Sequence, residues 1–139
     1  QPYKAGDVTI YEKKRIKMVL NTNFYQVTST IETSDGSDAQ LAVGVVDFGK
    51  GRVVENAEAG LLSVMEQISE KDGVIVSAVI ADPKAIDSFA SYGKDRLVLL
   101  NVKSGENILS VANGEVGAVG VVGSLALASA CSDNIGIVL

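Results

Sequence analysis

Short apolar runs rich in Val, Ile and Leu, each ended by a turn sequence, recur along this chain of 139 residues. Short β-branched runs between turn residues are typical of β-strands. The chain is 47% hydrophobic but only 5% aromatic and has no Trp, so its core must be built from Val, Ile, Leu and Ala. A chain of this length usually forms one domain and buries about two-thirds of its unfolded surface. We therefore expect a single domain over residues 1–139.

The apolar runs predict most of the strands. Residues 24–32 alternate in the two-residue period of a strand, and the turn sequence Thr33–Asp38 follows them. Residues 39–48 form a continuous apolar run, which is typical of a strand buried on both faces. The segments expected to form strands are 15–20, 24–32, 39–48, 74–80, 96–102, 107–112 and 135–139.

Two segments have the period of a helix instead. In the first, apolar residues recur at i, i+3, i+4 and i+7 after Asn56, a candidate N-cap. These apolar residues are Leu61, Val64, Met65 and Ile68. In the second, Asp82 is a candidate N-cap, Pro83 takes the first helical position and Gly93 ends the helix. The order of elements predicts an α+β fold, a mixed β-sheet with two or three helices packed on one face and at least one parallel strand pair.

Charge and residue usage argue against several classes of function. A net charge of −5 is the opposite of what a duplex-binding protein normally carries, so we expect no nucleic-acid partner. The basic run Lys13–Lys17 is interpreted as a solvated strand edge, where lysine also prevents aggregation, and contact with an anion or a nucleic acid is the alternative. No stretch has the length and flanks of a membrane span.

Catalytic and metal-binding groups are scarce. The chain has no His and a single Cys, Cys131, so we expect no zinc site and no thiol nucleophile with a basic partner. Asp82 and Asp87 are the candidate carboxylate pair for acid–base chemistry, but helix capping already accounts for Asp82. We therefore expect a protein that is not an enzyme and holds no cofactor.

Glycine recurs at every third position in the segment 113–132. The Walker pattern is absent, and Glu115 would repel a phosphate, so a nucleotide loop is disfavoured. A surface that allows close packing is the remaining interpretation, whether the segment is a helix or a strand. The candidate assembly and close-packing residues are Gly114, Gly117, Gly120, Gly123 and Ser124.

The same segment resembles a known family. Shell proteins of bacterial microcompartments have a strand that runs into a Gly-Asp/Glu-Val-Gly-Ala-Val stretch, followed by an alanine-rich helix and a final strand. Residues 96–139 have this order, and residues 114–119 read GEVGAV. The resemblance implies a ferredoxin-like α+β sandwich that tiles as hexamers or trimers around a small pore.

These observations lead to two hypotheses of different classes. The first is a structural subunit of a symmetric, self-assembling shell, capsid or filament, whose expected partners are copies of itself, with other shell or capsid subunits as further candidates. The second is a small-ligand-binding or regulatory module in which the glycine-rich segment lines the pocket. An enzyme that uses carboxylates, Tyr92, Lys94 or Cys131 ranks last.

Overall fold

The structure, a computed structural model, describes residues 2–21, 24–49, 51–69 and 73–116. Within these ranges nearly all regular structure is β, and every strand pair is antiparallel. The elements are β1 (Tyr3–Ala5), β2 (Val8–Met18), β3 (Phe24–Thr33), β4 (Ala39–Val46), β5 (Arg52–Asn56), β6 (Leu61–Ser69), β7 (Gly73–Ala81), the 3-10 helix η1 (Pro83–Ala85), β8 (Ile86–Tyr92), β9 (Asp95–Val102) and β10 (Asn107–Val116).

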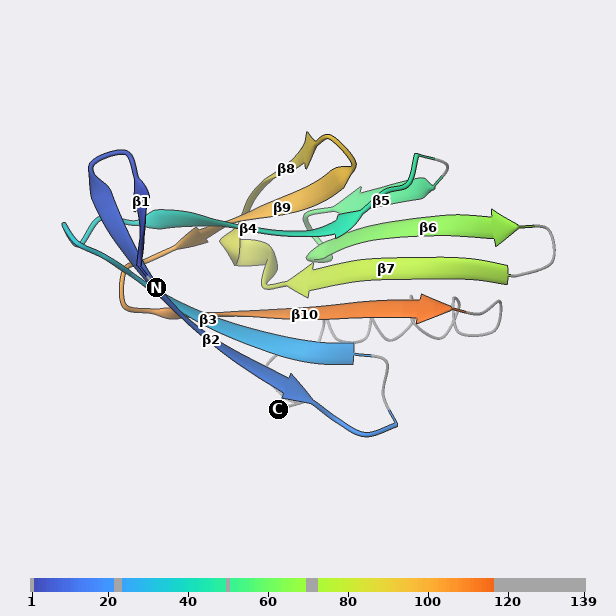
Figure 1. Ribbon diagram of the computed structural model, residues 1–139, viewed down its shortest axis with the longest axis horizontal. Helices are drawn as coiled ribbons and strands as arrows, with labels where there is room; N and C mark the ends of the chain where they lie inside the picture. The colour runs from blue at the N-terminus through green and yellow to red at the C-terminus, as the bar shows by residue number, and fades with distance from the viewer. Residues whose placement is uncertain (1, 22–23, 50, 70–72, 117–139) are drawn as a thin grey trace.

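Seven of these strands form the larger sheet, in the order β1-β2-β3-β10-β7-β6-β5. Strand β10 joins its two halves, because Ser110 lies opposite Val27 of β3 on one side and opposite Ala81 of β7 on the other. Figure 1 shows β10 running between these two strands. The sheet therefore forms only when residues far apart in the sequence meet.

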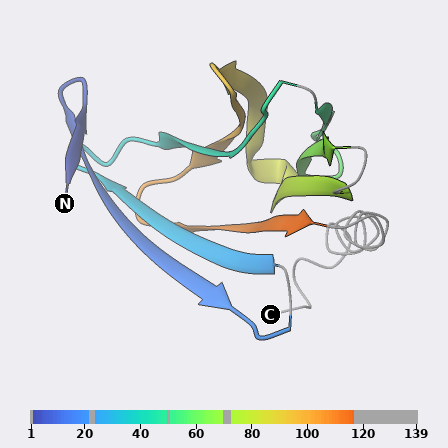
Figure 2. The same cartoon turned by 45° about the vertical axis from the view of Figure 1, so that its right-hand side comes forward.

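The smaller sheet has three strands in the order β4-β9-β8, with β9 in the centre. It lies over one face of the larger sheet, where β4 contacts β6 and β7 (Figures 1 and 2). The core fills the space between the two sheets and consists of Val, Ile, Leu and Ala, as the composition predicts. Its buried members are Ile10, Ile31, Leu41, Leu62, Val79, Ala81, Val98, Leu100, Val102 and Ile108.

Two of the apolar runs predicted as strands differ in their burial in the structure. Strand β7 is buried on both faces, since Val79 faces the core while Ala78 and Ile80 on the other face are also buried. Strand β4 is buried on one face only, and Gln40 and Ala42 alternate outward into solvent. The expectation of two buried faces for residues 39–48 is therefore wrong, because the smaller sheet is an outer layer.

The helix expected after Asn56 is also absent, and Leu61–Ser69 form strand β6. Asn56 does accept a hydrogen bond from the Ala59 N–H, at 2.9 Å, but this bond closes a turn. Gly60 ends that turn with φ +69°, and a Cβ there would collide with the Ala81 carbonyl oxygen. A nine-residue segment is marginal as a helix, whereas β5 and β7 supply hydrogen-bond partners on both of its sides.

The second expected helix is reduced to the three-residue helix η1. Asp82 caps it as predicted, accepting from the Lys84 N–H at 2.9 Å, with Pro83 at the start. The chain then turns into strand β8, where Phe89 pairs with Val98 and packs against the core. The prediction of a longer helix was wrong here, because a short apolar run also fits the two-residue period of a strand.

The predicted fold class is corrected accordingly. The described part of the chain is a two-layered antiparallel β structure, and neither of the helices that would define an α+β fold is present in it. The parallel strand pair expected from those helices is likewise missing from the described pairs, because parallel strands need a long crossover connection. The expected strand at 135–139 lies outside the described residues.

Candidate ligand-binding pocket

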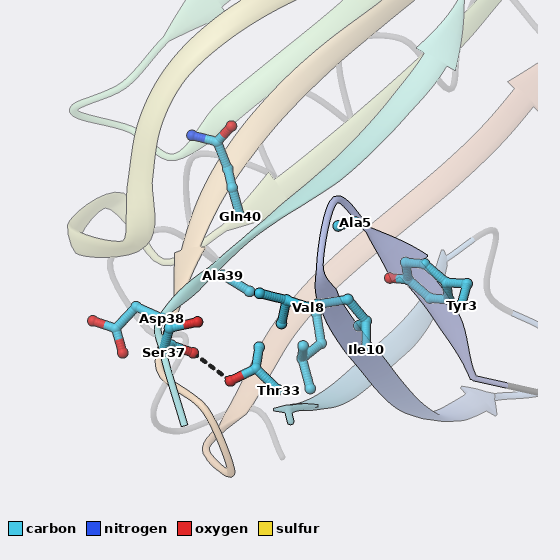
Figure 3. A pocket seen from close by; sticks show the side chains of 10 residues that line it. Tyr3, Ala5, Val8, Ile10, Thr33, Ser37, Asp38, Ala39 and Gln40 are labelled. Atoms are coloured by element: carbon cyan, nitrogen blue, oxygen red, sulfur yellow. Dashed lines mark hydrogen bonds between the residues drawn. The ribbon is translucent and has the colours of Figure 1, made fainter. Parts of the chain in front are cut away.

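An open cavity of about 380 Å³ lies where the β1–β2 hairpin faces the start of β4. We call it the hairpin pocket. Figure 3 shows the Tyr3 ring on one side and Ser37 and Asp38 on the other, with Val8 and Ile10 between them. Its lining residues are Tyr3, Ala5, Val8, Ile10, Ile31, Thr33, Ser37, Asp38, Ala39 and Gln40.

The floor and the rim of the hairpin pocket differ in character. The floor is apolar and continuous with the core, because Ile10 and Ile31 are only 6% and 1% exposed. The rim is exposed and polar, with Tyr3, Asp38 and Gln40 as its largest side chains. An apolar floor with a few polar groups around it is the usual construction of a small-molecule site, and the volume falls within the usual range of about 300–1,000 Å³.

The sequence element behind one wall is the turn Thr33–Asp38, which lies where the sequence predicts a turn. The buried Thr33 hydroxyl donates to the Ser37 carbonyl oxygen at 2.6 Å, and its N–H donates to the Ser104 Oγ at 3.0 Å. The Asp35 carboxylate accepts from both the hydroxyl and the N–H of Ser37, at 2.6 and 3.0 Å. These bonds hold the wall in one conformation, and the same Ser37 hydrogen bonds lower the pKa of Asp35.

The free polar groups of the rim set its electrostatics. Within the described residues, the Tyr3 hydroxyl and the Asp38 carboxylate make no hydrogen bond or ion pair. The lining contains no Lys, Arg or His, so the single carboxylate makes the pocket negative. A ligand with a hydrogen-bond donor or a positive charge is therefore favoured over an anion.

A polar cluster extends outward from the rim across all three strands of the smaller sheet. Gln40 on β4 donates from Nε2 to Asp87 Oδ2 at 3.1 Å, and the Ser88 hydroxyl donates to the same oxygen at 2.8 Å. Asn101 on β9 approaches the other oxygen of Asp87 at 3.4 Å. The register of β8 shifts at Asp87, and such a bulge redirects a side chain. The cluster thereby fixes the Gln40 amide at the edge of the hairpin pocket.

A second bound carboxylate, Asp47, has a structural role. It is buried at the end of β4, where Oδ1 accepts from the Gly49 N–H at 2.7 Å. Its Oδ2 accepts from Nε and Nη2 of Arg96, at 2.9 and 2.7 Å. The Gly49 N–H, followed by the Arg96 guanidinium, lowers the pKa of Asp47. All of its short contacts are internal, so we assign it to the β4–β9 connection and not to a site.

The residues predicted for close packing are mostly outside the described part of the chain. Gly114 lies in strand β10 opposite Ser77, so a strand is the correct alternative at that position. Gly117, Gly120, Gly123 and Ser124 lie outside the described residues, as does Cys131. Gly114 is not among the residues that line the hairpin pocket, and the expectation that the glycine-rich segment lines a pocket otherwise concerns residues outside the described ranges.

The hairpin pocket was not predicted from the sequence. Its lining comes from β1, β2, β3, the turn before β4 and β4 itself, all within residues 3–40. The one available signal was the polar turn Thr33–Asp38 between two apolar strands, which we interpreted only as a turn. Asp82 and Asp87 do not act as a pair, because Asp82 caps η1 and Asp87 belongs to the polar cluster.

The described residues lack two further kinds of feature, a metal-binding cluster and a membrane-spanning helix. No group of three or more His, Cys, Asp or Glu side chains there is arranged to hold a metal ion. No helix in the same ranges has the length and apolar character to cross a membrane.

The described residues form an antiparallel, two-layered β domain with a candidate small-molecule pocket at one end of its core. Residues 1–111 match the family described as "Domain of unknown function (DUF4861)", and the chain belongs to this family. No curated protein and no solved structure matches the chain. The family match contains every residue of the hairpin pocket.

The resemblance to microcompartment shell proteins is therefore wrong. It rested on residues 96–139, whereas the family match covers the N-terminal 111 residues. The ferredoxin-like sandwich that it implied also conflicts with the antiparallel β architecture. Neither the fold nor the family supports a shell or capsid subunit.

Proposed function

We propose that this domain binds a small uncharged or cationic molecule in the hairpin pocket. The observation that carries the proposal is an apolar floor joined to a rim with an unpartnered hydroxyl and an unpartnered carboxylate, those of Tyr3 and Asp38. The floor would contact the apolar part of the ligand, and the rim would orient its donors. The proposal develops the hypothesis of a ligand-binding module.

The wall of the pocket supports this proposal. Thr33, Ser37 and Asp35 are already bonded to one another and to Ser104, so little side-chain or loop entropy remains to be lost when a ligand binds. Gln40 is fixed in the same way by Asp87. No catalytic step is assigned to the pocket, and the expectation that the chain is not an enzyme stays a prediction.

The test is a screen of small amines, polyols and carboxylates, followed by NMR chemical shifts and thermal denaturation. Binders should shift the resonances of Val8, Ile10 and Ala39 and raise the melting temperature with concentration. Ala5→Trp, which places an indole at the mouth, should abolish binding. Ala42→Trp on the exposed face of β4 is the matched control and should leave binding unchanged.

Charge is tested separately. Asp38→Asn should weaken a cationic binder about tenfold and leave a neutral binder within about twofold, because only the Coulomb attraction is lost. Asp7→Asn, an exposed aspartate outside the lining, should change neither. The proposal is overturned if every binder survives Ala5→Trp or if carboxylates bind as well as amines.

Self-association, the other hypothesis from the sequence, stays a prediction. Light scattering across a concentration series would test it on the same samples. A mass equal to one chain at every concentration would contradict it.

A further inference from the structure

Beyond Ile10, strand β2 forms the outer edge of the larger sheet (Figures 1 and 2). Strand β1 pairs only with Val8–Ile10, and within the described residues no strand lies along the outer side of residues 11–18. The backbone groups on that side of the strand are therefore open to pairing with another chain. We call residues 11–18 the free edge.

One face of the free edge carries a row of positive charge. Lys13, Arg15 and Lys17 alternate along it, and all three are exposed. Their partners across the sheet on β3 are the uncharged residues Thr30, Thr28 and Gln26.

No carboxylate balances this row nearby. Glu32 is the sole acidic residue of β3, and it lies opposite Tyr11, at the far end of the strand from Lys17. Among the described residues, Lys13, Arg15 and Lys17 form no ion pair. The local charge is thus positive and unpaired in a chain whose net charge is −5.

The opposite face of the free edge is apolar toward its end. Ile16 and Met18 are 59% and 78% exposed, and they lie opposite Val27 and Tyr25 of β3. Lys14 on the same face already pairs with Glu12, with Nζ 3.1 Å from Oε1. This face therefore presents exposed apolar surface next to a locally balanced charge pair.

We propose that the free edge binds an extended segment of a partner protein, in which acidic and apolar residues alternate, as an additional strand of the larger sheet. Successive side chains of a strand point to opposite faces. The acidic residues of the segment would then lie beside Lys13, Arg15 and Lys17, and its apolar residues beside Ile16 and Met18. Main-chain hydrogen bonds supply affinity in this mode, and the alternating side chains supply specificity.

Charge complementarity favours this occupant over a second copy of the chain. Two free edges side by side would bring Lys and Arg against Lys and Arg, and like charges directly opposite destabilise strand pairing. The same lysines that prevent self-pairing therefore select an acidic strand. An anionic polymer without a peptide backbone would meet the charges but leave the open N–H and C=O groups of the edge unpaired.

The test uses a labelled synthetic peptide, Gly-(Glu-Val)4-Gly with blocked ends, and measures binding by fluorescence anisotropy and amide hydrogen exchange. We expect saturable binding that weakens with salt, together with slower exchange of amides within residues 11–18. A second peptide, N-methylated at every Glu and Val, keeps the side chains and the charge but has no Glu or Val N–H that can donate to a ladder. It should bind at least about tenfold more weakly.

Variants of the protein locate the site. Arg15→Glu combined with Lys17→Glu should weaken binding at least about tenfold, because the acidic peptide is then repelled by the free edge and no longer attracted to it. Lys84→Glu combined with Lys103→Glu makes the same change in net charge at exposed positions outside β2 and should change binding less than about twofold. Both pairs are on the surface, so folding is expected to be kept, and circular dichroism checks it.

Three results would overturn the proposal. The first is equal binding of the N-methylated peptide, which would reveal electrostatic attraction without strand addition. The second is equal loss in the Lys84/Lys103 variant, which would reveal non-specific attraction. The third is peptide binding with no slowing of exchange in residues 11–18.

Discussion

The two parts of strand β2, residues 8–10 and residues 11–18, differ in their strand pairing and burial. Residues 8–10 pair with β1, Ile10 also pairs with Thr33 of β3, and its side chain is buried in the core beside the hairpin pocket. Residues 11–18 continue the same strand with one side open, and Ile16 is mostly exposed there. Two isoleucines on the same face of one strand therefore differ in burial because of which elements surround them, not because of their own chemistry.

The largest difference in stability is expected when each of these two isoleucines is replaced by alanine. Ile10→Ala should lower the free energy of unfolding by about 2–5 kcal/mol, because it leaves a cavity in the core. Ile16→Ala should lower it by less than about 0.5 kcal/mol, because the side chain is already in water. Urea denaturation of both variants checks this, and equal losses would contradict the burial of Ile10.

A smaller effect is expected at Thr33, the residue opposite Ile10. Thr33→Val should lower the free energy of unfolding by about 0.5–1.5 kcal/mol, because the buried Thr33 hydroxyl no longer donates to the Ser37 carbonyl oxygen. Thr28→Val, opposite Arg15 on the free edge, is the control and should be close to neutral. NMR should show that the loss at Thr33 also increases motion of the turn that forms the pocket wall.

Folding stability should depend on pH through two carboxylates that accept hydrogen bonds, those of Asp35 and Asp47. Asp35 and Asp47 have pKa values below the ordinary 3.8, so the folded state binds these protons less readily than the unfolded state. Their contribution to stability is present above about pH 4 and is lost as the pH falls through the lowered pKa values. Denaturation between pH 2 and 6 should show this loss.

Substitutions distinguish the contributions of the two carboxylates to the pH dependence of stability. Asp47→Asn should flatten the pH dependence and also weaken the contact with Arg96. Asp35→Asn should flatten it through the turn bonds to Ser37. An unchanged pH profile in both variants would contradict the assigned causes.

The smallest effect is expected from the charges of the free edge. Arg15→Ala and Lys17→Ala should change the free energy of unfolding by no more than about 0.5 kcal/mol each, because exposed charges without ion-pair partners contribute little. Thermal denaturation at low and high salt is the measurement. A large loss of stability would show that these residues support the fold, and not only a surface.

Several elements could be predicted because their signals are local. The turn Thr33–Asp38 is determined by Asp and Gly chemistry, and the Asp82–Pro83 cap by a side chain that reaches a neighbouring N–H. The basic run was correctly interpreted as a strand edge, since Lys13–Lys17 lie along one. Residues 61–69 and 86–92 could not be assigned, because their apolar spacing fits both helix and strand.

The hairpin pocket could not be predicted for a related reason. No residue in its lining belongs to a motif, and the cavity exists only because β1, β2 and β4 meet at one end of the core. The repeated glycines, which led to the prediction of a close-packing surface, lie mainly outside the described residues and outside the family match.

The sequence by itself determined the residue types that build the core, most of the strand positions, the turn before β4 and the cap at Asp82. These depend on side-chain type and on contacts within a few residues. Only the tertiary structure decided that Leu61–Ser69 is a strand, that one isoleucine of β2 is buried and another exposed, and that an open cavity and an open edge lie at the two ends of β2. The physical reason is that a strand finds its hydrogen-bond partners and its burial in segments far away in the sequence.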